Sequence, residues 1–415
     1  MRSLLISPSA PIPPWSGTSQ RTDLIRRALA GLGRVDVILL GRPPSELLLA
    51  EASDTQAGGS VDWLPKAFAE RRSIWQAVGV SGPMARRLQH NLGRHADRYA
   101  PDPAASARLR EKVNLDDYDV VVVRYLLPCA RLGLAGSSRV IIDVDDLDSG
   151  VYRSRAEAPN TPLAKRLWYK ARHIWPVDRI TRRLISQAGA AWVANEHDVE
   201  LLGLSNMSAL PNIPYVALEG WPDVAPRSVD GDSVLTVASM THGPNARGVD
   251  WFLETAWSDI RSVAPGLRYR IVGSGMSEEQ RQRWGRYEGV EPVGFVEDLS
   301  SEYARSLFSI APIHEGGGTK IKVLESLAYG RTAVVTAHAH TGLDSHLVSG
   351  ESLLAVEDRQ FADACVALVR DSELRWSLAA SGREVVRQHY SPERFFAVVR
   401  QTVAGLVGRP SGTTQ

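Results

Sequence analysis

Cysteine is scarce in this sequence, and long apolar runs are missing. The two cysteines, Cys129 and Cys365, fall in different halves of the chain, so we expect no disulfide and a reducing, cytoplasmic setting. Neither stands in a Cys-x-x-Cys or Cys-x-x-His pattern, and no His-Glu-x-x-His motif occurs, so we expect no metal site and no cysteine nucleophile. No stretch approaches the ~20 apolar residues that a membrane-spanning helix needs. The short apolar stretch 3–7 runs directly into a proline-rich loop, which favours a first strand over a signal peptide.

The net charge is only +1, but it is unevenly distributed. Residues 1–220 hold 28 Lys and Arg against 23 Asp and Glu, whereas the remaining residues hold 20 against 24. Two helical-looking basic stretches contribute much of the excess, and one of them interleaves basic and aromatic residues. Such a face suits an anionic membrane surface or an acidic acceptor; the alternative is a solvated helix face whose tryptophans lie in the core. The residues are Lys165, Arg166, Trp168, Tyr169, Lys170, Arg172, Trp175, Arg179, Arg182 and Arg183 in the mixed stretch, and Arg71, Arg72, Arg86, Arg87 and Arg94 in the earlier one.

Strand-like and helix-like segments alternate through both halves, as in parallel sheets covered by helices. The expected strands are 3–7, 35–40, 118–125, 139–146 and 190–195 in the first half, and 234–239, 268–275, 290–296, 307–313, 332–337 and 352–356 in the second. After the first strand of the second half we expect a helix from about Val249. We therefore predict an α/β protein of two doubly wound, Rossmann-like domains facing a cleft, because ligands of such sheets bind at the carboxyl ends of the strands. The predicted division is a domain over 1–213, a linker over 214–232, a domain over 233–390, a helix over 391–408 that returns toward the first domain, and a mobile tail over 409–415.

The most informative segment is HEGGGTKIKVLESLAYGRTAVVTA, residues 314–337. An apolar strand precedes it, and we expect a helix that opens at Thr319, capped by that residue's own hydroxyl, and closes at Gly330. Gly316, Gly317 and Gly318 carry no Cβ, so a phosphate can approach their amides and the free N–H groups of the helix N-terminus. The two lysines that follow add positive charge, so this segment indicates a diphosphate site rather than a plain turn.

Several motifs occur in the order seen in one enzyme family. The second half carries VASMTHGPNARGVDWFLE, YRIVGSG, VGFVEDL, the triple-glycine helix, HTGLDSHLVSGESLLAVED and HYSPERF. This half closely resembles the retaining glycosyltransferases of family 4, which have the GT-B fold. The first half is similar more weakly, through PIPPWSG, IDVDDLDS and WVANEHDVELL followed by LPN.

The resemblance implies a nucleoside-diphosphate sugar as donor substrate, no cofactor and a metal-independent site. It assigns the ribose hydroxyls to Glu325, where one carboxylate accepts two hydrogen bonds, and it assigns electrostatic catalysis to the two lysines. We expect the acceptor or the donor sugar to be positioned by Asp145 or Asp146, although this acidic cluster could equally cap the next turn. The donor-binding residues that the resemblance implies are Gly17, Met240, Thr241, His242, Asn245, Gly294, Phe295, Val296, Gly316, Gly317, Gly318, Thr319, Lys320, Lys322 and Glu325.

One departure from the family pattern concerns the donor sugar. Many members have a pair of glutamates separated by seven residues, and the first orients the sugar; here Gly317 stands at that position. Glu315 lies two residues too early and is the nearest substitute. Asp143 and Asp145 form an Asp-x-Asp pattern like that of metal-dependent glycosyltransferases, but the second-half motifs imply a metal-independent site, so we interpret it as accidental. Nor does VGSGMS, residues 272–277, contain the third glycine of a dinucleotide fingerprint.

The sequence therefore predicts an enzyme that moves a sugar to an acceptor hydroxyl with retention of anomeric configuration, in glycan, glycolipid or glycosylated natural-product synthesis. The expected partners are the sugar nucleotide, a glycan, lipid-linked or small acceptor and an anionic membrane at the cytoplasmic face, with no role for nucleic acid. Two alternatives remain at this stage. One is a sugar-nucleotide 2-epimerase of the same architecture, for which no convincing acid–base set is visible. The other is a non-catalytic nucleotide-binding partner subunit, suggested by the missing first glutamate.

Overall fold

The computed structural model describes residues 1–54, 59–65, 95–158, 161–223 and 231–408. The earlier basic stretch from Arg71 to Arg94 and the tail 409–415 lie outside these residues. The chain divides into two compact units, one formed by Met1–Leu210 with Phe396–Gln415 and the other by Pro211–Phe395. The prediction placed the end of the first domain at residue 213.

Unit 1 is built on a sheet of seven parallel strands in the order β3-β2-β1-β4-β5-β6-β7. The order reverses between β1 and β4, which makes the sheet doubly wound. The strands are β1 (Arg2–Ser7), β2 (Arg34–Leu40), β3 (Val61–Leu64), β4 (Val120–Arg124), β5 (Val140–Asp145), β6 (Ala190–Val193) and β7 (Met207–Ala209). The central strands are buried on both faces, as Leu4, Leu5 and Ile6 of β1 show, and this accounts for their continuous apolar sequence.

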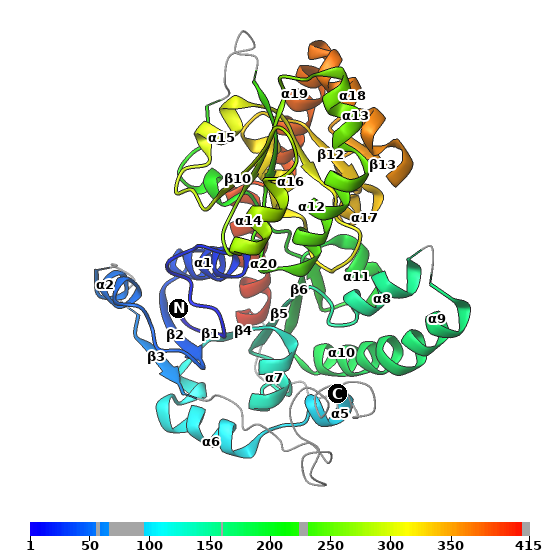
Figure 1. The fold of residues 1–415 in the computed structure, drawn as a ribbon. Coiled ribbons are helices and arrows are strands. Elements are labelled where there is room, and N and C mark those ends of the chain that lie inside the picture. Colours follow the sequence, from blue (N-terminus) through cyan, green and yellow to red (C-terminus); the bar gives the residue numbers. More distant parts are fainter. Residues whose placement is uncertain (55–58, 66–94, 159–160, 224–230, 409–415) are drawn as a thin grey trace. The chain divides into compact units, whose positions relative to one another are not determined.

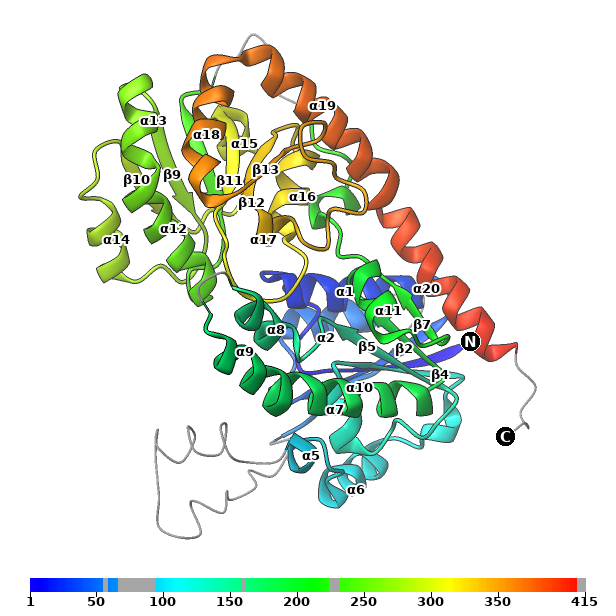
Figure 2. The same ribbon diagram turned by 90° about the vertical axis from the view of Figure 1, so that its right-hand side faces the viewer.

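Helices cover both faces of this sheet. Figures 1 and 2 show α1 on one face and α7 on the other, with α6 beyond α7. The second half of α20 also packs on unit 1, where Trp192 of β6 donates from Nε1 to Thr402 Oγ1 at 3.1 Å. The helices are α1 (Gly17–Ala30), α2 (Glu46–Asp54), α5 (His95–Arg98), α6 (Pro103–Lys112), α7 (Leu126–Leu132), α8 (Gly150–Glu157), α9 (Leu163–Tyr169), α10 (Trp175–Gln187), α11 (Glu196–Leu202) and α20 (Pro392–Val407).

Unit 2 has six parallel strands in the order β10-β9-β8-β11-β12-β13, with its reversal between β8 and β11. The strands are β8 (Ser233–Val237), β9 (Arg268–Val272), β10 (Val290–Gly294), β11 (Ser306–Ala311), β12 (Ala333–Thr336) and β13 (Leu354–Val356). The helices are α12 (Gly243–Thr255), α13 (Trp257–Val263), α14 (Glu278–Trp284), α15 (Ser300–Arg305), α16 (Ile321–Ala328), α17 (Ala337–His340), α18 (Phe361–Arg370) and α19 (Ser372–His389). Figure 1 shows α12, α13 and α18 on one side of the sheet and α15 on the other.

The predicted α/β class and the two doubly wound sheets are confirmed. All eleven predicted strands form, within a few residues of their expected ends, but β3 and β7 were missed. Both lie at the edge of the sheet of unit 1 and are short, with four and three residues. Edge strands are only partly buried, so they lack the long apolar runs by which central strands are recognised.

Candidate functional site

The reversal of strand order in unit 2 brings two loops together at the carboxyl ends of β8 and β11. The loop after β8 leads into α12, and the loop after β11 contains the three glycines and leads into α16. The two loops touch, because a Cβ placed on Gly316 would lie 3.5 Å from Pro244 Cγ and 3.9 Å from His242 Cε1. This is the position at which doubly wound sheets bind their ligands.

The glycine loop has a backbone that other residues rarely adopt. Gly316 and Gly318 have φ values of 104° and 91°. The helix after them was predicted to open at Thr319, but α16 begins at Ile321, with Lys320 as an N-cap that makes no side-chain hydrogen bond. The reason is that Lys320, at ψ 74°, still has a non-helical backbone, so the loop extends farther than the sequence indicated. Gly330 has the left-handed φ of 71° expected of the residue that closes the helix.

Helix α12 also begins at the site. It was predicted from about Val249 but starts at Gly243, because Pro244 occupies the first turn, where its fixed φ suits a helix. Its N-cap, His242, makes no side-chain hydrogen bond to the helix. Two helix N-termini without side-chain caps therefore adjoin the glycine loop, and each presents N–H groups and a partial positive charge. This arrangement favours an anion.

Both predicted lysines lie in this loop region, and each is hydrogen-bonded. Lys320 Nζ donates to Gly318 O at 2.7 Å, which braces the loop, and Lys322 Nζ donates to Asn245 Oδ1 at 2.6 Å. Burial and then the charge of Lys320 lower the pKa of Lys322 to about 7. The Thr319 hydroxyl is buried and has no hydrogen-bond partner among the described residues. The loop thus holds a hydroxyl and two amines that a phosphate could use.

Glu325 lies one turn farther along α16. The Tyr303 hydroxyl donates to Glu325 Oε2 at 3.3 Å, and Tyr303 stacks on Tyr329 with ring centroids 4.5 Å apart. Burial raises the pKa of Glu325 to about 7, against the opposing effects of the Tyr303 hydrogen bond and of Lys322. Sequence reasoning missed both tyrosines. Tyr329 follows Glu325 by four residues as the C-cap of α16, so helical spacing could have indicated it.

The predicted base loop follows β10. Gly294 has a φ of 90° and is buried, whereas Phe295 is 60% exposed. Val296 packs against the small core cluster that contains Tyr303 and Tyr329. The base loop and Glu325 are therefore connected through the same pair of stacked tyrosines.

The remaining predicted donor residues of unit 2 differ in their exposure. Met240 is 2% exposed and contributes to the core, while Thr241 and His242 are exposed. Gly317 is exposed in the middle of the loop. Glu315 forms an ion pair with Arg247 of α12, which sequence reasoning missed. His338 of α17, also missed, lies 2.9 Å through Nε2 from Gly316 O and so contacts the loop on another side.

The other predicted site residues, Gly17, Asp145 and Asp146, belong to unit 1. Gly17 opens α1 after β1, where Ser16 and Ser19 form a capping box. Asp145 is the last residue of β5, and Asp146 follows it directly.

Asp143 of β5 is at the centre of a buried charge network. Arg21 Nη2 lies 2.6 Å from its Oδ1, Arg124 Nη1 lies 2.6 Å from its Oδ2, and all three side chains are fully buried. Asp145 lies 3.5 Å from Arg21 Nε and 3.3 Å from Arg124 Nη2. Burial lowers the pKa of Arg21, but the two aspartates outweigh it and the net shift is upward. With both oxygens of Asp143 held by guanidinium groups, this part of the Asp-x-Asp pattern has a structural role.

The backbone beside this network is strained. Tyr125, directly after β4, has a φ of 69°, and Asp145 has a φ of 64°. Arg124 connects them, because its Nη2 donates to the Tyr125 hydroxyl at 2.8 Å and to Asp145 Oδ2 at 3.3 Å. Residues other than glycine rarely adopt this positive-φ backbone conformation, and those that do are found most often at binding and catalytic sites. The carboxyl edge of the sheet in unit 1 is therefore a second place to expect a ligand.

Both cysteines are buried, which does not suit a nucleophile. Cys129 lies in unit 1 and Cys365 in unit 2, and both are buried free thiols. Burial raises the pKa of Cys129 to about 12 and that of Cys365 well above its usual value. Among the described residues, no group of three or more His, Cys, Asp or Glu side chains is arranged to hold a metal ion.

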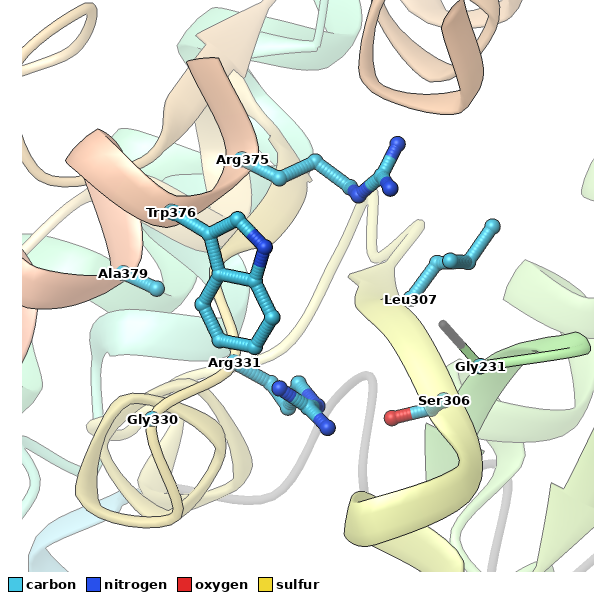
Figure 3. Close-up of a pocket in the computed structure, with 8 residues that line it drawn as sticks. All are labelled: Gly231, Ser306, Leu307, Gly330, Arg331, Arg375, Trp376 and Ala379. Carbon is cyan, nitrogen blue, oxygen red and sulfur yellow. The ribbon is translucent and has the colours of Figure 1, made fainter. Parts of the chain in front are cut away.

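A small cavity of unit 2 is lined by Ser306 and Leu307 at the amino end of β11, by Arg331 and by residues of α19 such as Arg375 and Trp376 (Figure 3). Its volume of about 10 Å³ leaves room for one water molecule. Arg331 donates to Tyr303 O at 2.9 Å and Ala304 O at 2.8 Å, and lies 5.0 Å from the ring of Trp376. Arg375 donates to Val369 O at 3.1 Å. Both arginines thus cap the C-terminal ends of helices and have a structural role.

A larger open groove of about 650 Å³ lies on unit 1 beside α10. The predicted basic stretch forms α9, a π-helical turn over Lys170–Ile174 and α10. The alternative in which its tryptophans lie in the core is wrong, because Trp168 is 41% and Trp175 61% exposed. Arg182 is not a free surface charge, since it donates to the carbonyls of Leu201 and Leu202 at the end of α11. The groove is lined by His95, Ala96, Arg172, Trp175, Pro176, Arg179, Ile180 and Arg183.

Comparisons with known proteins agree with this geometry. Residues 231–371, most of unit 2, match the family of glycosyl transferases group 1. A search of curated proteins found no match. Among solved structures, TarM from S. aureus in complex with UDP superposes with a TM-score of 0.64 at 10% identity, over 99% of this chain and 100% of that one. Sucrose-phosphate synthase from Thermosynechococcus elongatus gives 0.64 at 14% identity, over 97% and 98% of the chains.

A third structure, HepE from Anabaena in complex with UDP and glucose, gives a TM-score of 0.60 at 11% identity, over 97% of this chain and 99% of that one. At these identities the similarity to solved structures establishes the fold alone. The family match concerns residues 231–371 of unit 2. Residues 231–371 thus resemble the glycosyl transferases group 1 family, and the whole chain has the two-domain GT-B fold.

Proposed function

We propose that this protein transfers a sugar from a nucleoside diphosphate to an acceptor hydroxyl, with retention of anomeric configuration and without a metal ion. The observation that carries the proposal is the convergence, in unit 2, of the glycine loop, the uncapped N-termini of α12 and α16, and Lys320 and Lys322. Glu325 lies one turn beyond them. An anion with a polar sugar attached is the ligand that this set of groups fits.

In the proposed complex the diphosphate contacts the glycine loop. Backbone amides of Gly316 to Gly318 and the buried Thr319 hydroxyl donate to phosphate oxygens, and the first-turn amides of α16 face the same charge. The ribose hydroxyls donate to the Glu325 carboxylate, and the base lies on the loop of Gly294 to Val296. UDP-sugars are the first donors to test, since two of the similar structures hold UDP.

Catalysis is electrostatic in this proposal. As the bond between sugar and diphosphate breaks, negative charge grows on the leaving phosphate, and Lys320, Lys322 and the helix N-termini stabilise it. The proton of the acceptor hydroxyl passes to that departing phosphate, so no protein nucleophile is needed. We assign acceptor or sugar positioning to Asp145 and Asp146 in unit 1, next to the strained Tyr125.

The proposal also includes peripheral binding to an anionic membrane at its cytoplasmic face. No helix of the described residues is long and apolar enough to cross a membrane. The surface formed by α9, the π turn and α10 combines exposed apolar residues with basic ones, as an interfacial surface does. Arg179 and Arg183 are exposed and make no ion pair within the described part of the chain. The exposed apolar residues are Leu163, Leu167, Trp168 and Trp175.

Product analysis tests the enzymatic proposal. Donors are first screened by thermal shift, and the donor with the largest shift is incubated with the enzyme, with water or sugar alcohols as acceptors. Transfer or hydrolysis with retention supports the proposal. An isomerised donor would indicate an epimerase, and binding without turnover would indicate a nucleotide-binding subunit, the alternative suggested by Gly317 and by the pairing of Glu315 with Arg247.

Liposome co-sedimentation tests the membrane proposal. We expect binding to anionic vesicles at low salt, weaker binding at high salt, and loss of binding in the double variant Arg179→Glu, Arg183→Glu. Arg286→Glu with Arg359→Glu, at exposed positions of unit 2, is the matched control. Wild-type protein that stays in the supernatant with anionic vesicles would show that membrane binding is not part of the function.

A further inference from the structure

Asn245 connects the two loops of the site in unit 2. It lies in the first turn of α12, where its Nδ2 donates to Ser239 O at 2.8 Å, in the loop after β8. Its Oδ1 accepts a hydrogen bond from Lys322 Nζ at 2.6 Å. Each end of the amide has a partner of the appropriate kind, so the orientation of the side chain is fixed. The carbonyl oxygen of the amide is therefore aimed at the lysine.

Charged neighbours of both signs act on the Lys322 amine. Lys320, two residues earlier, repels it, and Glu325, three residues later, attracts it. His242 is the N-cap of α12, and burial, followed by the charges of Lys322 and Arg247, lowers the pKa of its imidazole. Arg247 is itself paired with Glu315. Asn245 is the hydrogen-bond acceptor that the structure gives Lys322.

We propose that Asn245 is a positioning residue that holds the Lys322 amine toward the glycine loop until a phosphate oxygen of the donor takes its place. The inference rests on the proposed function and adds a role for a residue that touches the catalytic lysine. A neutral amide suits this role, because it orients the amine without cancelling its charge. A carboxylate at position 245 would form an ion pair with Lys322 and would repel the diphosphate.

Two variants separate these effects. Asn245→Asp keeps the size and the acceptor but adds charge, whereas Asn245→Leu keeps the size and removes the acceptor. Both variants lose the Nδ2 donor to Ser239 O, so that loss is the same in the two. Glu254→Gln, at an exposed position later on α12, is the control for a change of charge on this helix. Folding of each variant is checked by circular dichroism and by its thermal midpoint.

The first measurement needs no donor. Competitive acetylation of the free protein across a pH series, followed by mass spectrometry, gives the titration midpoint of Lys322. We expect the midpoint to rise in Asn245→Asp by about one unit or more, because an opposite charge within ~4–6 Å favours the protonated amine. We expect it to fall in Asn245→Leu and to stay at the wild-type value in Glu254→Gln. An unchanged midpoint in both Asn245 variants would overturn the positioning role.

The second measurement is the pH profile of kcat/KM for donor hydrolysis or transfer. Its alkaline limb reports the pKa of Lys322 in the free enzyme. This limb should move to higher pH in Asn245→Asp and to lower pH in Asn245→Leu. A structural role of Asn245 alone would lower activity at every pH without moving the limb. If wild-type protein binds and turns over no donor, the proposed function fails, while the acetylation result still decides whether Asn245 controls Lys322.

Discussion

The hydroxyl of Tyr303 donates to Glu325 Oε2 at 3.3 Å, and this contact leaves the other oxygen of Glu325, Oε1, for a ligand. Tyr303 is 1% exposed and stacks on Tyr329, so the hydroxyl that bonds the carboxylate is itself fixed by packing. A glutamate placed in this way can accept the two hydroxyls of a ribose in a fixed orientation.

Loss of this carboxylate should chiefly affect donor binding. Glu325→Ala leaves the ribose hydroxyls without an acceptor, which costs roughly 1–3 kcal/mol, or about 5–150-fold in Kd. Tyr303→Phe should weaken binding less, since it removes a single long hydrogen bond. Calorimetric titration with the best donor measures both, and Glu351→Ala, at an exposed site of the same unit, is the control. Equal affinity of Glu325→Ala and wild type would contradict the ribose role.

Loss of Lys322 should act more on kcat than on affinity. Lys322→Ala removes a positive charge that is needed most when the leaving phosphate becomes more negative. The transition state therefore loses more electrostatic stabilisation than the ground state does. We expect kcat to fall at least ~100-fold, the usual cost of one electrostatic donor. Steady-state kinetics measure the effect, with Arg286→Ala, an exposed cation of unit 2, as the control. A variant with normal kcat and a raised KM would place Lys322 in ground-state binding instead.

Donor binding to the free enzyme should have a pH optimum near 7. Glu325 must be ionised to accept hydrogen bonds from the ribose, and because its pKa is about 7, binding is lost as the pH falls through that value. Lys322 must be protonated to attract phosphate, and because its pKa is also about 7, binding is lost as the pH rises through that value. Kd measured from pH 5 to 9 should therefore pass through a minimum. Affinity that stays constant over this range would show that neither group titrates there.

Lys322 should also reduce the stability of the free protein. Its folded-state pKa is lowered from 10.5 to about 7, so the free energy of unfolding decreases as the pH falls from about 10 toward 7. Lys322→Met should raise the thermal midpoint by a few degrees at pH 6, and this gain should shrink toward pH 10. Lys165→Met, at an exposed site, should show no such dependence on pH. A lower midpoint for Lys322→Met at pH 6 would mean that its contact with Asn245 outweighs the burial of charge.

In unit 1, the network of Asp143 should be essential for stability. Asp143→Ala leaves Arg21 and Arg124 buried without their shared carboxylate, and breaking such a buried pair costs about 3–5 kcal/mol. Denaturant unfolding measures the loss, with Asp116→Ala at an exposed position as the control. If activity is instead lost on chelation with EDTA and restored by Mn²⁺, while stability is unaffected, the Asp-x-Asp pattern binds metal after all.

Much of this arrangement could be predicted from the sequence because the relevant signals are local. Buried parallel strands give continuous apolar runs, and three consecutive glycines before two lysines indicate a phosphate loop. The beginning of α16 was predicted two residues too early, since a threonine that looks like a cap is here part of the loop. The beginning of α12 was predicted six residues too late, because Pro244 was not recognised as a first-turn residue.

Contacts between distant segments could not be predicted. Tyr303 and Glu325 are 22 residues apart, Asn245 and Lys322 are 77 apart, and Arg21 and Asp143 are 122 apart. Tyr303 and Glu325 lie on the helices before and after β11, whereas the other two pairs meet because segments distant in sequence are brought together by the order of strands in the sheet. A single sequence gives the residue types but not these pairings, so the carboxylate of Asp145 was predicted as a site residue without the two arginines that hold it.

The central claim is that the glycine loop and α16 of unit 2 bind the nucleoside diphosphate of a sugar donor. Calorimetric titration of UDP into the wild-type protein and into Glu325→Ala at pH 7, in the presence of EDTA, tests it most directly. The account predicts saturable binding at one site in the wild type and an affinity at least about fivefold lower in the variant. If wild type and variant bind UDP equally well, or if neither UDP nor any other nucleoside diphosphate binds the wild type, the site has been assigned wrongly.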